Sequence, residues 1–152
     1  MDYRFEVVDS PAMNALSMRT VTPAANLPQE LGKAYTAIIA YLGEIGEQPC
    51  EAAFAAYYNM DMEKLDVEMG FPVPRPLPGR GEIKASQIPA GKAATYLYQG
   101  PYQEMAPVYE AMSGWMSDSG LQPIGVVYEF YYNSPMEVPA SELLTKIVFP
   151  LK

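Results

Sequence analysis

The chain has 152 residues, a hydrophobic fraction of 49% and a formal net charge of −8. This length is enough to bury one core without disulfides or metal ions, and the negative charge argues against direct binding to a nucleic-acid backbone. The sequence holds one cysteine and no histidine, which excludes an internal disulfide, Ser-His-Asp and Cys-His catalysis, and the common histidine metal sites.

The two halves of the sequence repeat one pattern. The dipeptide Pro11-Ala12 recurs 78 residues later as Pro89-Ala90, and Tyr57-Tyr58-Asn59 recurs 74 residues later as Tyr131-Tyr132-Asn133. The two separations differ by four residues, a change that loops between the elements tolerate. We therefore predict repeat one at about 5–73, a proline-rich crossover at 74–82 and repeat two at about 83–151.

Repeat one is predicted to form a strand, a helix and two further strands. The first extended segment, at about 5–20, bends at Pro11, because proline is tolerated in a sheet only at edges and bulges. A helix follows at about 27–45, with an apolar stripe that packs on the sheet. Two strands are then expected at about 50–59 and 65–73, the second with alternating apolar and polar residues.

Repeat two is predicted to contain the same elements. Its extended segment lies at about 83–98, its helix at about 103–119 and its last strands at about 124–133 and 143–151. Each repeat is too small to be stable alone, so we predict one α+β domain over residues 1–152 with pseudo-two-fold symmetry. Its antiparallel sheets are expected to leave a central ligand groove along the pseudo-dyad.

One carboxylate distinguishes the repeats. Glu129 stands among aromatic and β-branched residues, whereas its counterpart in repeat one is Ala55, so the fold itself does not require the acid. Strand alternation places Glu129 with Ala53, Ala55, Tyr57 and Tyr131 on one face. We assign this face to the groove, because it combines small residues with a charge, and the bulkier opposite face to the core.

An enclosed Glu129 is expected to have a raised pKa unless it has a partner, and an incoming cation would restore the balance. Tyrosine faces around it would add to the attraction of a desolvated cation. The alternative is that Glu129 reaches solvent or pairs with a basic residue. Lys146 is a candidate for neutralising Glu129 or Glu68. We expect Glu68 to be solvated. The candidate ligand-binding residues are Glu129, Tyr131, Tyr57, Ala55, Tyr96, Tyr98, Trp115 and Phe71.

Several segments resemble the GyrI-like small-molecule-binding family. They are the turn 98–102, the strand 67–73, the segment 128–135 around Tyr-Glu-Phe-Tyr, and the last strand at 146–151. The resemblance implies two β-α-β-β repeats around a pocket for lipophilic, often cationic aromatic compounds. That family supplies effector-binding domains of AraC- and MerR-type multidrug regulators, and its buried acid falls on Glu129. Some stand-alone relatives are similar to hydrolases of cyclopropanoid compounds, and others are associated with DNA gyrase.

Three functions follow from these features. The leading hypothesis is a stand-alone module that binds lipophilic, cationic aromatic molecules around Glu129. The alternative is a hydrolase of strained-ring electrophiles, with Glu129 as general base and Tyr131, Tyr57 or Trp115 steering the electrophile. The third is an acidic protein-interaction module such as a gyrase modulator, which the sequence itself does not support.

No residue pattern indicates a cofactor or a metal site. The first residues lack the basic and apolar regions of a secretory signal, and no apolar run reaches the roughly 18 residues that a membrane-spanning helix needs. We therefore expect a cytoplasmic protein without contacts to membranes or nucleic acid.

Overall fold

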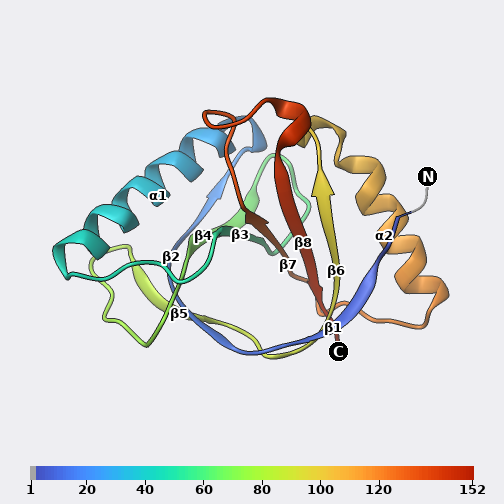
Figure 1. The fold of residues 1–152 in the computed structure, drawn as a ribbon, viewed down its shortest axis with the longest axis horizontal. Coiled ribbons are helices and arrows are strands. Elements are labelled where there is room, and N and C mark those ends of the chain that lie inside the picture. The colour runs from blue at the N-terminus through green and yellow to red at the C-terminus, as the bar shows by residue number, and fades with distance from the viewer. Residues whose placement is uncertain (1–2) are drawn as a thin grey trace.

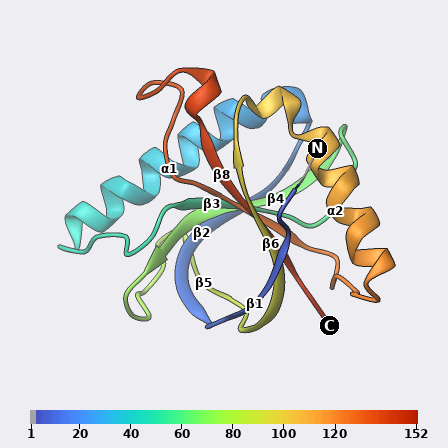
Figure 2. The same ribbon diagram turned by 45° about the vertical axis from the view of Figure 1, so that its right-hand side comes forward.

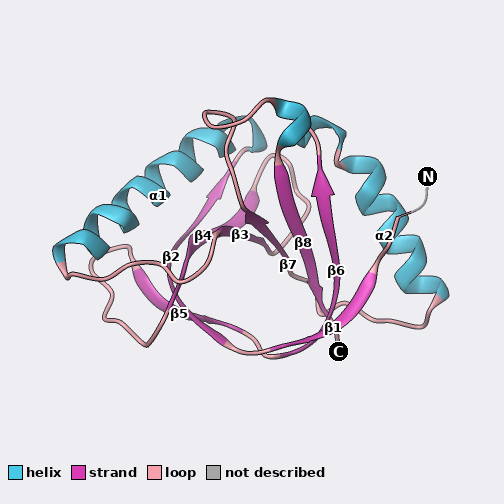
Figure 3. Cartoon of the chain, viewed as in Figure 1, coloured by secondary structure: helices cyan, strands magenta, loops and turns pink. Residues whose placement is uncertain are grey.

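The computed structural model describes residues 3–152 (Figure 1). Short 3₁₀ helices at Ala24–Asn26 and Tyr102–Glu104 lead into the two α-helices, and a third at Ala140–Glu142 precedes the last strand. Figure 3 shows how helices and strands are distributed. The helices are α1 (Leu27–Glu44) and α2 (Ala106–Asp118), and the strands are β1 (Glu6–Ser10), β2 (Met13–Thr22), β3 (Ala53–Tyr57), β4 (Leu65–Val73), β5 (Lys84–Ile88), β6 (Gly91–Gln99), β7 (Val127–Tyr131) and β8 (Leu144–Pro150).

All eight described strands form one antiparallel sheet in the order β1-β6-β8-β7-β3-β4-β2-β5. The repeats meet at its centre, where β3 pairs with β7 and Ala55 lies directly opposite Glu129. The pseudo-dyad therefore passes between these two residues. The predicted α+β fold of two tandem β-α-β-β repeats is confirmed, with the sheets of the repeats joined into one.

The extended segment at the start of each repeat divides at its proline bend. β1 pairs with β6 of repeat two, whereas β2 pairs with β4 of repeat one. In the same way β5 pairs with β2, and β6 pairs with β8. The two repeats thus exchange their outer strands, which run beneath the sheet in Figure 1 and curl it into a half-barrel. Prediction of one bent strand within each repeat missed this exchange, because sequence patterns do not identify pairing partners.

Asparagine side chains close the hairpins at the centre of both repeats. The Asn59 side-chain oxygen accepts a hydrogen bond from the Asp66 amide at 3.0 Å, and Asn133 accepts one from the Leu144 amide at 2.8 Å. These contacts follow the last backbone hydrogen bonds of the hairpins, which Tyr58 and Tyr132 donate to the Asp66 and Leu144 carbonyls. The strands β3 and β7 are shorter at both ends than the strands predicted at 50–59 and 124–133.

Both helices cover the same face of the sheet (Figures 1 and 2). They bury side chains that are related by the 74-residue repeat: Ala34, Ile38 and Leu42 on α1, and Val108, Met112 and Met116 on α2. This is the face of Ala55 and Glu129, which we had assigned to the groove. The helices therefore cover part of this face: Ala55 is fully buried in contact with α1, whereas Tyr57, Glu129 and Tyr131 remain partly exposed.

The opposite face lies inside the curl and forms a core, as predicted from its bulk. Phe54 is fully buried there between Tyr128 and Phe130, with ring centroids 5.9 and 6.0 Å away. Ile88 and Val148 pack against the same cluster. Within residues 3–152, neither helix is long and apolar enough to cross a bilayer.

Candidate functional site

Glu129 lies in the strip between the two helices. Its carboxylate accepts hydrogen bonds from the hydroxyl groups of Tyr109 on α2 and Tyr131 on β7, the latter at 2.6 Å. The Tyr131 hydroxyl also lies 3.0 Å from that of Tyr57 on β3. All four residues are half-buried, so each keeps part of its surface exposed. The structure therefore brings together Glu129, Tyr131 and Tyr57 of the predicted site residues.

The same tyrosines occur in both repeats, but only one repeat offers them a carboxylate. Tyr35 on α1 is the 74-residue counterpart of Tyr109, as Tyr57 is of Tyr131. With Ala55 in place of an acid, the Tyr35 hydroxyl donates instead to the Phe54 carbonyl at 2.8 Å. The site is thus a symmetric frame of tyrosines with one negative charge on one side of the dyad.

Glu129 has no cationic partner within residues 3–152. The ion pairs formed by these residues join Arg19 to Asp66, Arg75 to Glu47, Arg80 to Glu44 and Lys92 to Asp9. Burial raises the pKa of Glu129, and the two tyrosine hydroxyl donors offset part of this rise. Burial and the nearby Glu129 charge also raise the pKa values of Tyr109 and Tyr131, so both phenols stay neutral donors.

The raised pKa of Glu129 predicts a pH dependence of stability. Because its pKa in the folded state lies above the ordinary value of 4.5, the folded protein holds this proton more tightly than the unfolded chain. The free energy of unfolding should therefore fall as pH rises from about 4.5 through the folded pKa, and then level off. The loss is about 1.4 kcal/mol for each unit by which the pKa is raised.

Urea unfolding of the wild type and Glu129→Gln across this pH range measures the effect. The stability of the variant relative to the wild type should increase with pH, because glutamine does not titrate. A constant difference between the two proteins at all pH values would contradict the raised pKa.

The remaining predicted residues lie outside this strip or have structural contacts. Tyr96 and Trp115 pack on Phe5, with centroids 5.3 and 5.4 Å from the Phe5 ring, and border the same apolar cluster as Tyr57 and Tyr109. Tyr98 is buried, and its hydroxyl donates to the Pro101 carbonyl at 2.7 Å in the turn before α2. Phe71 makes an edge contact with Tyr35, and their ring centroids are 5.3 Å apart.

Lys146 does not neutralise Glu129. It pairs across the sheet with Phe130, the neighbour of Glu129 in sequence, and therefore points from the opposite face. The expectation that Glu68 is solvated is wrong: this side chain is half-buried and accepts a hydrogen bond from the Tyr58 hydroxyl at 2.6 Å and another from Ser17.

Three residues near the site were not selected from the sequence as site residues. Tyr109 donates directly to Glu129, and Tyr102 lies edge-on to Tyr131 with its ring centroid 6.0 Å away. Thr145, which pairs with Tyr131, is fully buried, and its hydroxyl has no hydrogen-bond partner among the described residues. Tyr109 was identifiable, because Tyr35 and Tyr109 repeat in the same register as Tyr57 and Tyr131.

No metal centre accompanies this site within residues 3–152. No three carboxylate or thiol side chains of the described chain come close enough together to hold an ion. What the site offers chemically is one carboxylate, neutral hydroxyl donors and aromatic faces. This combination favours a cation with an apolar body.

The fold is similar to several solved structures. The C-terminal domain of EcmrR matches with a TM-score of 0.78 and 21% identity, over 100% of this chain and 99% of that one. The structure of SAV2435 bound to tetraphenylphosphonium matches with a TM-score of 0.69 and 11% identity, over 100% of this chain and 94% of the other. A hydrolase from Listeria innocua matches with a TM-score of 0.70 and 15% identity, over 99% of this chain and 92% of the hydrolase chain.

One similar structure is of a longer protein. In a complex of EcmrR with DNA, the EcmrR chain matches with a TM-score of 0.86 and 22% identity, over 99% of this chain. The present chain spans 57% of that EcmrR chain. No curated protein matches the sequence. The model of the GyrI-like small molecule binding domain, however, matches residues 3–152, nearly the entire sequence. The chain therefore belongs to the GyrI-like family of small-molecule-binding domains.

Proposed function

We propose that this protein binds lipophilic, cationic aromatic molecules between α1 and α2, with Glu129 as the counter-charge. The observation that carries the proposal is the state of this carboxylate. It is half-buried and hydrogen-bonded by neutral hydroxyls, and within residues 3–152 no lysine or arginine pairs with it. A bound cation supplies the missing charge.

The energetics favour a cation over a neutral ligand. Two phenol donors stabilise the carboxylate only in part, since burial still raises its pKa. A unit positive charge about 5 Å away contributes roughly 3 kcal/mol at an effective dielectric constant of about 20, before its own desolvation is subtracted. A lipophilic cation loses less hydration on entering the site than a small ammonium ion, so more of this attraction remains.

The tyrosines determine the kind of cation. Tyr35, Tyr57, Tyr109 and Tyr131 line the strip from both helices and both central strands, and Tyr102 lies beside them with 38% of its surface exposed. Each ring face can contribute about 0.5–2 kcal/mol to a desolvated cation. The hydroxyls of Tyr57, Tyr109 and Tyr131 bond to one another or to Glu129, and the Tyr35 hydroxyl donates to the Phe54 carbonyl. This leaves mainly aromatic carbon of these four rings to contact a ligand.

The comparisons support this ligand class. SAV2435 was solved with tetraphenylphosphonium, a cation enclosed by four phenyl rings, and it shares the fold of this chain. EcmrR was solved on DNA. For the present chain we propose a small-molecule site only, since its net charge of −8 disfavours direct contact with a phosphate backbone.

Calorimetry with ligands that differ mainly in charge tests the proposal. We expect tetraphenylphosphonium to bind at least tenfold more tightly than neutral triphenylphosphine oxide, and the anion tetraphenylborate to bind weakest. The cation should also raise the melting temperature, because it binds the folded state. Equal affinities for all three compounds would contradict an electrostatic site.

A hydrolase acting in the same site is the second candidate. The raised pKa of Glu129 suits a general base, and the structure is similar to a hydrolase from Listeria innocua. Glu129 would take a proton from water while the water oxygen attacks a strained ring carbon. The broken carbon–carbon bond leaves its electron pair on a conjugated acceptor, which then takes the proton from Glu129.

Mass spectrometry of a cyclopropanoid alkylator incubated with the protein tests this activity. Turnover predicts a product one water heavier that is absent with Glu129→Gln. An unchanged alkylator, together with clear binding of tetraphenylphosphonium, would reject catalysis and leave the binding function.

A further inference from the structure

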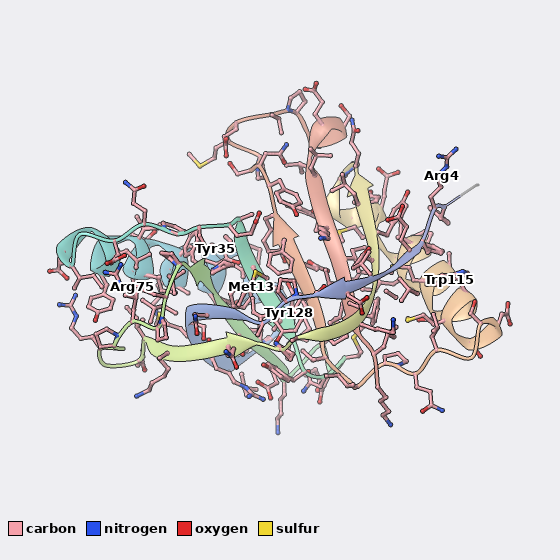
Figure 4. All side chains as sticks on the ribbon, turned by 60° about the horizontal axis from the view of Figure 1, so that its bottom comes forward. Arg4, Met13, Tyr35, Arg75, Trp115 and Tyr128 are labelled. Atoms are coloured by element: carbon pink, nitrogen blue, oxygen red, sulfur yellow. The ribbon has the colours of Figure 1, made fainter. Side chains whose placement is uncertain are left out.

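A hollow lies on the side of the sheet opposite Glu129. Its volume is about 280 Å³, close to the lower limit of small-molecule pockets. The two bent connections, Ser10–Met13 and Ile88–Ala93, face the ends of β7 and β8 across it. In Figure 4, which brings this side forward, Met13 and Tyr128 lie near each other, and both line the hollow. The chain surrounds this hollow with Tyr128, Phe130, Tyr132, Ile124, Val148, Pro150, Lys146, Lys92 and Glu51, among others.

Lys146 contributes a positive charge to this hollow. The side chain is half-buried, lines the cavity and has no acidic partner within 4.0 Å among residues 3–152. Its counterpart 78 residues earlier is Glu68, which is hydrogen-bonded by Ser17 and Tyr58. The repeats therefore differ here as they do at Glu129 and Ala55, with a change in charge at one pair of equivalent positions.

The walls beside Lys146 are apolar and aromatic. Tyr132 and Ile124 remain 43% and 46% exposed although both line the hollow, so their surfaces are available to a ligand. Phe130 and Tyr128 are buried and form its inner wall. A ligand with one or two fused aromatic rings fits a hollow of this volume.

Of the two lysines that line the hollow, Lys92 forms an ion pair and Lys146 forms none among residues 3–152. Lys92 lies 3.4 Å from Asp9 in an exposed ion pair. Glu51 is exposed, and its charge helps to raise the pKa of Tyr132, which places the acid near that ring. Two lysines and one glutamate line the hollow, which gives it one net positive charge in a protein of net charge −8.

We propose that this hollow binds small aromatic carboxylates. The ring lies against Tyr128, Phe130 and Tyr132, and the carboxylate accepts a hydrogen bond from the Lys146 ammonium. This site is independent of the one at Glu129, takes ligands of opposite charge and lies on the other face of the same sheet.

Titration of the full chain with 2-naphthoate, followed by calorimetry and by amide shifts in NMR spectra, tests the proposal. Four proteins are compared: the wild type, Lys146→Gln, Glu51→Gln, and the matched control Lys33→Gln, whose exposed lysine lies on α1 on the other face. 2-Naphthylmethanol serves as the neutral ligand. Thermal melts of each variant check that the fold is retained.

The wild type should bind 2-naphthoate about tenfold more tightly than 2-naphthylmethanol, and Lys146→Gln should remove this preference. Lys33→Gln should keep it, and Glu51→Gln should strengthen 2-naphthoate binding by removing a nearby negative charge. Saturating tetraphenylphosphonium should not displace 2-naphthoate. An equal affinity for both naphthyl compounds, an unchanged preference in Lys146→Gln, or displacement by tetraphenylphosphonium would each overturn the proposal. None of these results depends on whether the Glu129 site binds cations.

Discussion

Replacing Glu129 by glutamine will lower the affinity for tetraphenylphosphonium by about 30-fold and leave the affinity for triphenylphosphine oxide nearly unchanged. The substitution keeps the shape of the side chain and removes only its charge. The loss corresponds to about 2 kcal/mol, which is what remains of the Coulomb attraction at about 5 Å after the cation is desolvated. The comparison of the two ligands separates this electrostatic contribution from packing against the tyrosines.

A second half-buried carboxylate provides the control for this experiment. Glu68 lies on the opposite face of the sheet and, like Glu129, accepts hydrogen bonds from hydroxyl groups. Glu68→Gln changes the net charge by the same amount but should not alter tetraphenylphosphonium binding. Equal losses for the cation and the neutral ligand in Glu129→Gln, or an equal loss of cation affinity in Glu68→Gln, would contradict a specific role for Glu129.

Introducing a second acid on the pseudo-dyad will destabilise the fold strongly. Ala55 is fully buried and lies directly opposite Glu129 in the β3–β7 pair. We expect Ala55→Glu to lower the free energy of unfolding by about 4 kcal/mol at neutral pH. About half of this loss comes from overpacking against α1, and the rest from two carboxylates held about 5 Å apart.

Ala55→Gln isolates the two contributions. It adds nearly the same volume without charge, so it should cost only about 2 kcal/mol. Burial and the like charge raise the pKa values of both acids in the folded Ala55→Glu variant. Its deficit relative to Ala55→Gln should therefore shrink as pH falls toward the ordinary glutamate pKa. The measurement is urea unfolding at several pH values, and a deficit that is independent of pH would show that charge repulsion is not involved.

Much of the fold was predictable because the sequence repeats. The 74-residue register places the helices correctly, down to the glycines that end them: Gly46 and Gly120 both adopt φ of 71°, a conformation that favours glycine. The exchange of β1 and β5 between the repeats was not predictable. A strand pattern defines which residues share a face, whereas the choice of pairing partner depends on contacts between distant segments.

The candidate site was predictable in its central residue and less so in its surroundings. The contrast between Glu129 and Ala55 is visible in the sequence, and so is the equivalence of Tyr57 and Tyr131 in the two repeats. Alternation could not show that both helices cover this face, since a period of two residues says nothing about what packs on a strand. The donor from α2, Tyr109, was not selected as a site residue, because its position on the helix also fits an apolar stripe that packs on the sheet.

The sequence also did not show which neighbours Tyr96 and Trp115, two aromatic residues predicted to bind the ligand, would contact. Tyr96 shares the face of Glu129, but it pairs with Ile147 one strand further out and packs on Phe5. Trp115 extends from α2 to the same cluster, well apart from Tyr35 in Figure 4. Tyr96 is two strands away from Glu129, a separation that follows from the strand order, which the sequence pattern does not contain.

A crystal structure of the protein with tetraphenylphosphonium tests the central claim most directly. The account predicts that the phosphorus atom lies between α1 and α2 beside the Glu129 carboxylate, with phenyl rings against Tyr57, Tyr109 and Tyr131. A cation bound in the hollow beside Lys146, or bound anywhere without contact to Glu129 or these tyrosines, would contradict it.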